Sequence, residues 1–157
     1  MNVEYELSDR GDESFPFEYY LLDPLHARYV MPYHWHMDYE LVRVISGRLD
    51  LHVGNMRIEM TDGDSVFVPP GAIHGSLPPI GTYECVVFDA TKLFHSGSSN
   101  LKALRDFWDM RNEEPLIVKN GTPEAGYVES FFKATGNHIP FFLKSIIVLM
   151  KGSEEYS

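Results

Sequence analysis

Four side chains of the types that bind metal ions stand in two short segments of this 157-residue chain. His34, His36 and Glu40 belong to the first segment, and His74 follows the turn-forming residues Pro69–Gly71 in the second. On a continuous β-strand, residues separated by an even number of positions share a face, so the first three side chains are predicted to converge. Three imidazoles and a carboxylate could hold a divalent metal such as Zn, Fe(II), Ni or Mn, or could line a pocket for a polar small molecule.

The inward parity continues past these residues along the same predicted strand. Val42 shares it with Glu40 and is predicted to contact a ligand at the floor of the pocket. Tyr33, Trp35 and Tyr39 have the opposite parity, which favours packing on the outer face over stacking on a ligand. The sequence holds no nucleophile triad, phosphate loop or Cys-x-x-Cys motif, so no catalytic residue is assigned.

Short strands are predicted to position these residues. Alternating apolar and polar residues before and after Gly54-Asn55 predict an antiparallel hairpin, because this dipeptide suits a tight turn. The short spacing of the remaining apolar runs favours a barrel or sandwich over residues 15–97. The predicted strands cover residues 15–22, 26–31, 36–46, 48–53, 56–60, 65–68 and 82–89.

The pattern becomes helical in the tail, residues 98–157. One helix is expected from Ser99-Asn100 to about Glu114, with Leu101, Leu104 and Trp108 on its apolar face. A second is expected from Thr122-Pro123 to Gly136-Asn137, with inward residues Tyr127, Val128, Phe131 and Phe132. A third, over Ile139–Met150, is apolar on nearly all sides, which predicts that a second copy of the chain covers it in a homodimer.

Composition restricts the partners of the chain. The net charge is −10, so the chain alone is not expected to bind the phosphate backbone of nucleic acids. No apolar run is long enough for a membrane span, and no basic-then-apolar start resembles a signal peptide. The single cysteine, Cys85, stands in an apolar run and is expected to be buried and inert. These features favour a cytoplasmic protein with a polar, acidic and flexible arm at residues 1–14.

The spacing of these motifs resembles that of a known superfamily. The pattern H-x-H-x3-E-x6-G, from His34 to Gly47, and G-x5-P-x-G-x2-H, from Gly63 to His74, resemble the two motifs of the cupins. More narrowly, both segments are similar to the N-terminal ligand-sensing domains of AraC-type (AraC/XylS) transcription regulators. The sequence departs from the cupin pattern at two positions: Arg28 replaces a glycine, and Pro78 stands where asparagine is frequent.

The resemblance implies a mainly β fold, with a cupin-type antiparallel, jelly-roll-like β-barrel followed by C-terminal α-helices. It also implies a sensing and dimerisation domain that binds a small polar metabolite, such as a sugar, at His34, His36, Glu40, Val42 and His74. DNA binding would then belong to a C-terminal domain that is absent from this chain. The alternatives are a metal-dependent cupin enzyme (a dioxygenase, isomerase or decarboxylase) and a metal-binding storage or assembly module without signalling. In either case His34, His36, Glu40 and His74 would hold the ion.

Overall fold

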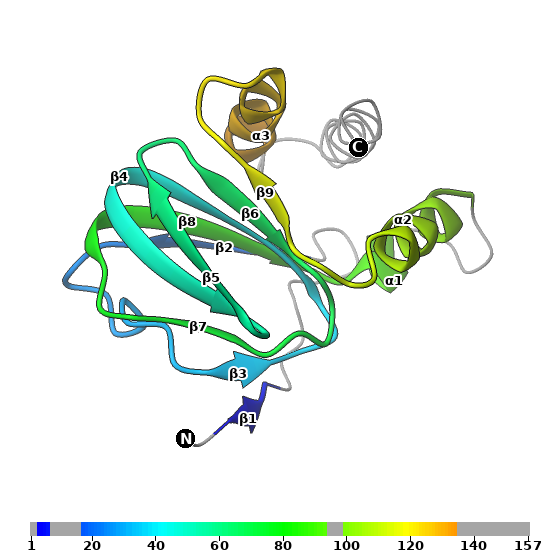
Figure 1. The fold of residues 1–157 in the computed structure, drawn as a ribbon, viewed down its shortest axis with the longest axis horizontal. Coiled ribbons are helices and arrows are strands. Elements are labelled where there is room, and N and C mark those ends of the chain that lie inside the picture. The colour runs from blue at the N-terminus through cyan, green and yellow to red at the C-terminus, as the bar shows by residue number, and fades with distance from the viewer. Residues whose placement is uncertain (1–2, 7–16, 94–98, 135–157) are drawn as a thin grey trace.

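The computed structural model describes residues 3–6, 17–93 and 99–134, and Figure 1 shows a curved sheet with two longer helices beside one of its faces. The strands are β1 (Glu4–Tyr5), β2 (Phe17–Leu22), β3 (His34–Trp35), β4 (Tyr39–Val53), β5 (Met56–Thr61), β6 (Ser65–Val68), β7 (His74–Ser76), β8 (Ile80–Phe88) and β9 (Leu116–Val118). The helices are α1 (Ala90–Leu93), α2 (Ser99–Met110) and α3 (Pro123–Ala134).

Strand β4 organises the sheet, because four other strands pair with it in antiparallel register. Its first half lies between β6 and β8, and its second half lies between β5 and β7. Two separate strands were predicted over this stretch, but the chain continues as one strand, with a register shift between Val44 and Ser46. Gly47 and Gly81 face each other beyond the shift, where a Cβ on either would lie 2.0 Å from a carbonyl oxygen of the opposite strand.

The mainly β, cupin-like character of the prediction is confirmed, but two details of the barrel differ. Strand β1 pairs with β3 in parallel, so the sheet is mixed and not purely antiparallel. The hydrogen-bonded path runs from β1 through β3, β7, β4 and β6 to β9, and the sheet is not closed. Among the described strands, β1 and β9 end this path and are not paired with each other.

Two apolar cores lie on opposite faces of β4. Val42 and Val44 face the core inside the curved sheet, whereas Tyr39 and Leu41 face a second core shared with the helices. In α2 the predicted face is buried, and Phe107 joins it. In α3, Val128, Phe131 and Phe132 are buried as predicted, but the Tyr127 prediction is wrong, because this residue is 41% exposed. At roughly 1.5–3 kcal/mol for each fully buried large side chain, these aromatic residues contribute much of the attachment of the helices.

Several local predictions differ from the structure. The predicted strand over residues 26–31 is instead a series of turns, because the side chains of Asp23 and His26 accept backbone hydrogen bonds from Leu25 and Arg28. Strands β7 and β9 were not predicted, since each has only three residues. The third predicted helix, Ile139–Met150, lies outside the described residues, as does most of the expected arm at residues 1–14.

No helix among the described residues is both long enough and apolar enough to cross a membrane.

Candidate ligand and metal site

The four predicted ligand-type residues lie together at the open end of the inner core. Their nearest ligand atoms are all within 4.8 Å of one another, and all of them except the half-buried His34 are buried. His34 comes from β3 and His36 from the connection to β4. Glu40 is the second residue of β4, and His74 is the first residue of β7. The predicted continuous strand is interrupted between Trp35 and Tyr39, so strand parity alone does not produce this arrangement. Instead, β3 pairs with β7 so that His34 stands opposite His74.

Each imidazole of the cluster is oriented by a main-chain carbonyl two residues away. The Nδ1 atoms of His34, His36 and His74 lie 2.7, 3.1 and 2.8 Å from the carbonyl oxygens of Pro32, Asp38 and Ala72. A carbonyl oxygen can only accept, so each Nδ1 carries the proton and donates it. In the neutral form of each ring, the lone pair is therefore on Nε2. This is the arrangement in which a histidine binds a metal through Nε2.

Glu40 lies at the centre of the cluster. Its Oε2 atom is 3.1 Å from Nε2 of His36 and 2.8 Å from Nε2 of His74. Two neutral imidazoles whose protons are on Nδ1 would present lone pairs to this oxygen, so each short contact needs a proton or a cation between its two atoms. The cluster is therefore built to hold positive charge, either as imidazolium or as a bound metal ion.

The pKa values follow from this geometry. Burial alone would raise the pKa of Glu40, but the charge of His74 and the hydrogen bonds from His36 and His74 hold it well below its usual range. Burial would lower the pKa of His74, but the charge and hydrogen bond of Glu40 raise it. The pKa of His34 is lowered by burial first and by the nearby His74 second. Glu40 is thus ionised at neutral pH and available as a metal ligand or hydrogen-bond acceptor.

The donor set fits a divalent transition metal. Three imidazole nitrogens and one carboxylate oxygen are the ligand types that suit Zn, Fe(II), Ni and Mn. Three of the four predicted ligands are oriented by carbonyl groups, which supply the outer support that metal-binding histidines usually have. The four residues can therefore hold a divalent metal ion.

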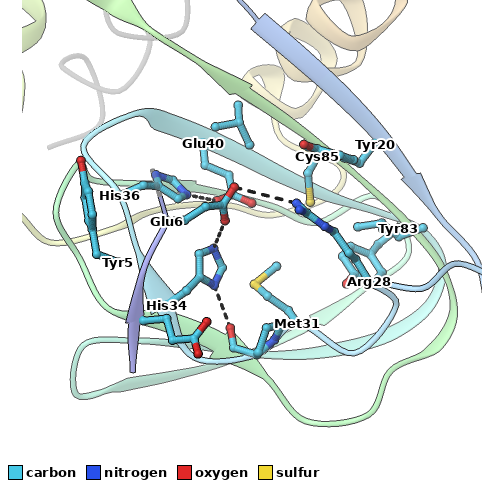
Figure 2. Close-up of a pocket in the computed structure, with 14 residues that line it drawn as sticks. Tyr5, Glu6, Tyr20, Arg28, Met31, His34, His36, Glu40, Tyr83 and Cys85 are labelled. Carbon is cyan, nitrogen blue, oxygen red and sulfur yellow. Dashed lines mark hydrogen bonds and ion pairs between the residues drawn. The ribbon is translucent and has the colours of Figure 1, made fainter. Parts of the chain in front are cut away.

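A cavity of about 420 Å³ opens next to the cluster, within the range of small-molecule sites (Figure 2). His34, His36 and Glu40 line it, whereas Val42 is fully buried in the inner core and is not among the lining residues. Cys85 is buried, as expected, and its sulfur faces the cavity. Burial first, and then the neighbouring Glu40, raise the pKa of its thiol well above the ordinary value, so the thiol stays protonated.

Several lining residues were not predicted as part of a site. Glu6 reaches the cavity from the end of β1 and lies 3.8 Å from the Arg28 guanidinium and 3.6 Å from Nε2 of His34. Tyr20, Met31 and Tyr83 complete much of the wall. One signal was available in the sequence, because Arg28 occupies a position where the cupin pattern has glycine. The others come from segments whose approach depends on long-range pairing.

Comparison with known proteins supports the fold assignment. Residues 25–77 match the Cupin domain family, and no curated protein matches the chain. Among solved structures, ToxT from Vibrio cholerae O395 has 11% sequence identity and a TM-score of 0.54, over 93% of this chain and 56% of that chain. An apo ToxT variant from Vibrio cholerae strain SCE256 has 14% identity and a TM-score of 0.53, over 94% and 58% of the two chains.

An RmlC-like cupin from Shewanella frigidimarina NCIMB 400 has 29% identity and a TM-score of 0.35, over 36% of this chain and 52% of that chain. The chain thus spans little more than half the length of each of these proteins. At these identities, the likeness to ToxT shows a common fold, which includes the helices beside the sheet.

Proposed function

We propose that this chain is the small-molecule sensing domain of a transcription regulator of the AraC type. The observation that carries the proposal is that one strand joins the cavity to the helical layer. Glu40 faces the cavity from β4, while its neighbours Tyr39 and Leu41 pack in the core that contains α2 and α3. A ligand that moves Glu40 would therefore change the packing of the helices directly, through adjacent residues of one strand.

The likeness to ToxT, an AraC-family regulator, supports the same proposal because it extends over both the sheet and the helices. On this proposal the protein is cytoplasmic, and DNA is read by a segment that is not in this chain. Homodimerisation through residues 139–150 is part of the proposal and rests on their sequence pattern alone. Replacing Phe141 and Val148 with Glu tests it, since a soluble monomer is expected if that apolar stripe is intermolecular.

A metal-dependent enzyme is the second candidate, and the clustered histidines and carboxylate are the observation that favours it. When bound, a metal would supply Lewis-acid or oxygen-activating chemistry. Glu40 would hold a negative charge at Oε2, and the carbonyl-oriented histidines would keep their Nε2 atoms directed at the site. The cavity would orient a substrate beside them.

A thermal-unfolding screen with sugars, organic acids and amino acids distinguishes the two candidates. A sensor should show a midpoint that rises with ligand concentration by mass action, and mass spectrometry should recover that ligand unchanged after hours. Glu40→Gln should abolish the shift, whereas Glu114→Gln, at an exposed position, should retain it. Turnover of the compound that is lost in Glu40→Gln while binding survives would instead identify an enzyme.

A further inference from the structure

A carboxylate of the chain itself occupies the polar end of the cavity. Figure 2 shows the Glu6 side chain between Arg28 and His34, with its carboxyl group directed into the cavity. Two of the contacts of its carboxyl group are 3.8 Å to the guanidinium of Arg28 and 3.6 Å to Nε2 of His34, and the Glu6 side chain is 25% exposed. The contact with Arg28 is a long ion pair at the rim of the pocket, and the contact with His34 faces the Nε2 lone pair of a neutral imidazole, so a better-placed carboxylate could replace Glu6.

Arg28 provides a permanent positive charge at this position. Its guanidinium lies 5.6 Å from the centre of the Tyr20 ring, which helps to hold it over the cavity mouth. Arginine stays protonated at all physiological pH values and offers a planar set of donors that matches a carboxylate. The 60% exposure of its side chain leaves it accessible to an entering ligand.

Away from Arg28 and the His34–His36–Glu40 cluster, part of the cavity wall is apolar. Leu22, Met31 and Val87 line it, and the Tyr83 hydroxyl is already donated to the carbonyl oxygen of Tyr29, at 2.7 Å. A sugar bound along this wall would leave hydroxyl groups against apolar side chains, which is unfavourable. A molecule with one anionic end and an apolar body would match both parts of the cavity.

We infer that the cavity binds an organic monocarboxylate with an apolar aliphatic or aromatic body, and that its carboxylate displaces Glu6 from the Arg28–His34 position. This inference rests on the proposed sensing function and narrows the ligand from a polar metabolite to an organic acid. Glu6 then acts as an internal competitor that lowers the apparent affinity for the external acid, because the free position is only partly populated.

Calorimetric titration of the EDTA-treated protein with hexanoate, 1-hexanol and glucose at neutral pH tests the inference. Hexanoate should bind about tenfold more tightly than hexanol, and glucose more weakly than either. Arg28→Gln should remove most of the preference for hexanoate over hexanol, whereas Arg28→Lys should keep part of it. Arg57→Gln, which removes an exposed arginine paired with Asp50, is the matched control and should change neither affinity.

Glu6→Gln provides the sharper measurement, because it should strengthen binding. Removing the competing charge should tighten hexanoate binding about three- to tenfold and leave hexanol binding unchanged. Glu114→Gln makes the same charge change at an exposed position that does not line the cavity, and it should alter both affinities by less than about twofold. Thermal unfolding of each variant checks that it is folded. If Arg28→Gln does not fold, the comparison is made with Arg28→Lys.

The outcomes separate this inference from the proposed function. Equal binding of hexanoate and hexanol, or no tightening in folded Glu6→Gln, would overturn the inference. If a neutral compound from the ligand screen binds the cavity and Arg28→Gln does not weaken it, the sensing function stands and the organic-acid inference fails. If neither the screen nor the three probes gives binding, both fail.

Discussion

Two buried carboxylates, Glu40 and Asp64, lie in different regions of the molecule and have different partners. Both residues are at most 5% exposed. Glu40 faces the cavity and contacts two imidazole nitrogens. Asp64 lies between the β5–β6 turn and the segment after β9, where it accepts hydrogen bonds at 2.9 Å from the backbone N–H groups of Thr61 and Asn120.

The difference in partners separates a carboxylate available for chemistry from one that stabilises the fold. Backbone N–H groups keep their protons and cannot turn away, so Asp64 is permanently paired with them. Imidazole Nε2 atoms can exchange a proton for a metal ion or a ligand. The group that Glu40 contacts can therefore change. We therefore expect substitutions at Glu40 to act mainly on binding and substitutions at Asp64 to act mainly on folding.

The largest expected effect is on metal binding. His74→Ala or His34→Ala should weaken metal binding about a hundredfold or more, because each removes one of only four protein ligands. Asp64→Asn, if folded, should bind metal normally. Elemental analysis of protein purified without an affinity tag, before and after incubation with Zn, Ni, Mn or Fe, measures the occupancy. If the unmodified protein holds less than about a tenth of an equivalent of every metal, the cluster does not bind metal and its remaining role is to line the ligand pocket.

Asp64→Asn should have the next largest effect, on stability. Losing charge-assisted hydrogen bonds from buried N–H groups should lower the free energy of unfolding by about 2–3 kcal/mol. For a domain of this size the melting temperature should fall by about 4–12 °C. Asp106→Asn, at an exposed position on α2, should change stability by less than about 0.5 kcal/mol. Equal effects of the two variants would remove the structural role assigned to Asp64.

The stability effect of Asp64 should also depend on pH. Burial would raise the pKa of its carboxyl, but the backbone donors of Asn120 and Thr61, together with Lys119, hold it below its ordinary value. A depressed folded-state pKa gives stability that is present above the unfolded-state value of about 4 and is lost as the pH falls through the folded-state value. Chemical unfolding of the unmodified protein and of Asp64→Asn should therefore show a difference in the free energy of unfolding. This difference should shrink only in acid, below about pH 4.

Substitution of Tyr83 should have the smallest effect on stability and binding. This residue shares its location with Glu40 and its type of partner with Asp64. This residue lines the cavity, but its hydroxyl is donated to the Tyr29 carbonyl, so it resembles Asp64 in its partners. Tyr83→Phe should lower the free energy of unfolding by about 1 kcal/mol while leaving the affinity for hexanoate within about twofold. A large loss of affinity without a loss of stability would show that position in the cavity matters more than the type of partner.

The sequence allowed the cluster to be predicted because its residue types and spacing are local to two segments. His34, His36, Glu40 and His74 come together as expected, although pairing of β3 with β7, and not one continuous strand, accounts for the place of His34. The organisation of the fold was likewise visible in the hairpin at Gly54-Asn55 and in the buried face of α2.

The parts that were missed depend on contacts between distant residues or on local turn chemistry. Asp64 meets Asn120 across 56 positions, and no pattern near either residue indicates the pairing. Glu6 meets Arg28 only because β1 pairs with β3, and Arg28 is placed by side-chain caps in the preceding turn. The outward position of Tyr127 reflects how far the core extends around α3, which helical periodicity does not determine.

The central position of β4 also has a consequence for how the chain folds. The β4–β5 hairpin closes a two-residue turn, but β4 must also find β8, where Leu41 pairs with Val86. Closing that long loop costs chain entropy before the buried contacts of β4 can form, so the hairpin should form first and the β4–β8 register should limit the rate. Refolding followed by stopped-flow fluorescence should then occupy milliseconds to seconds, with the cavity assembled only in the final step.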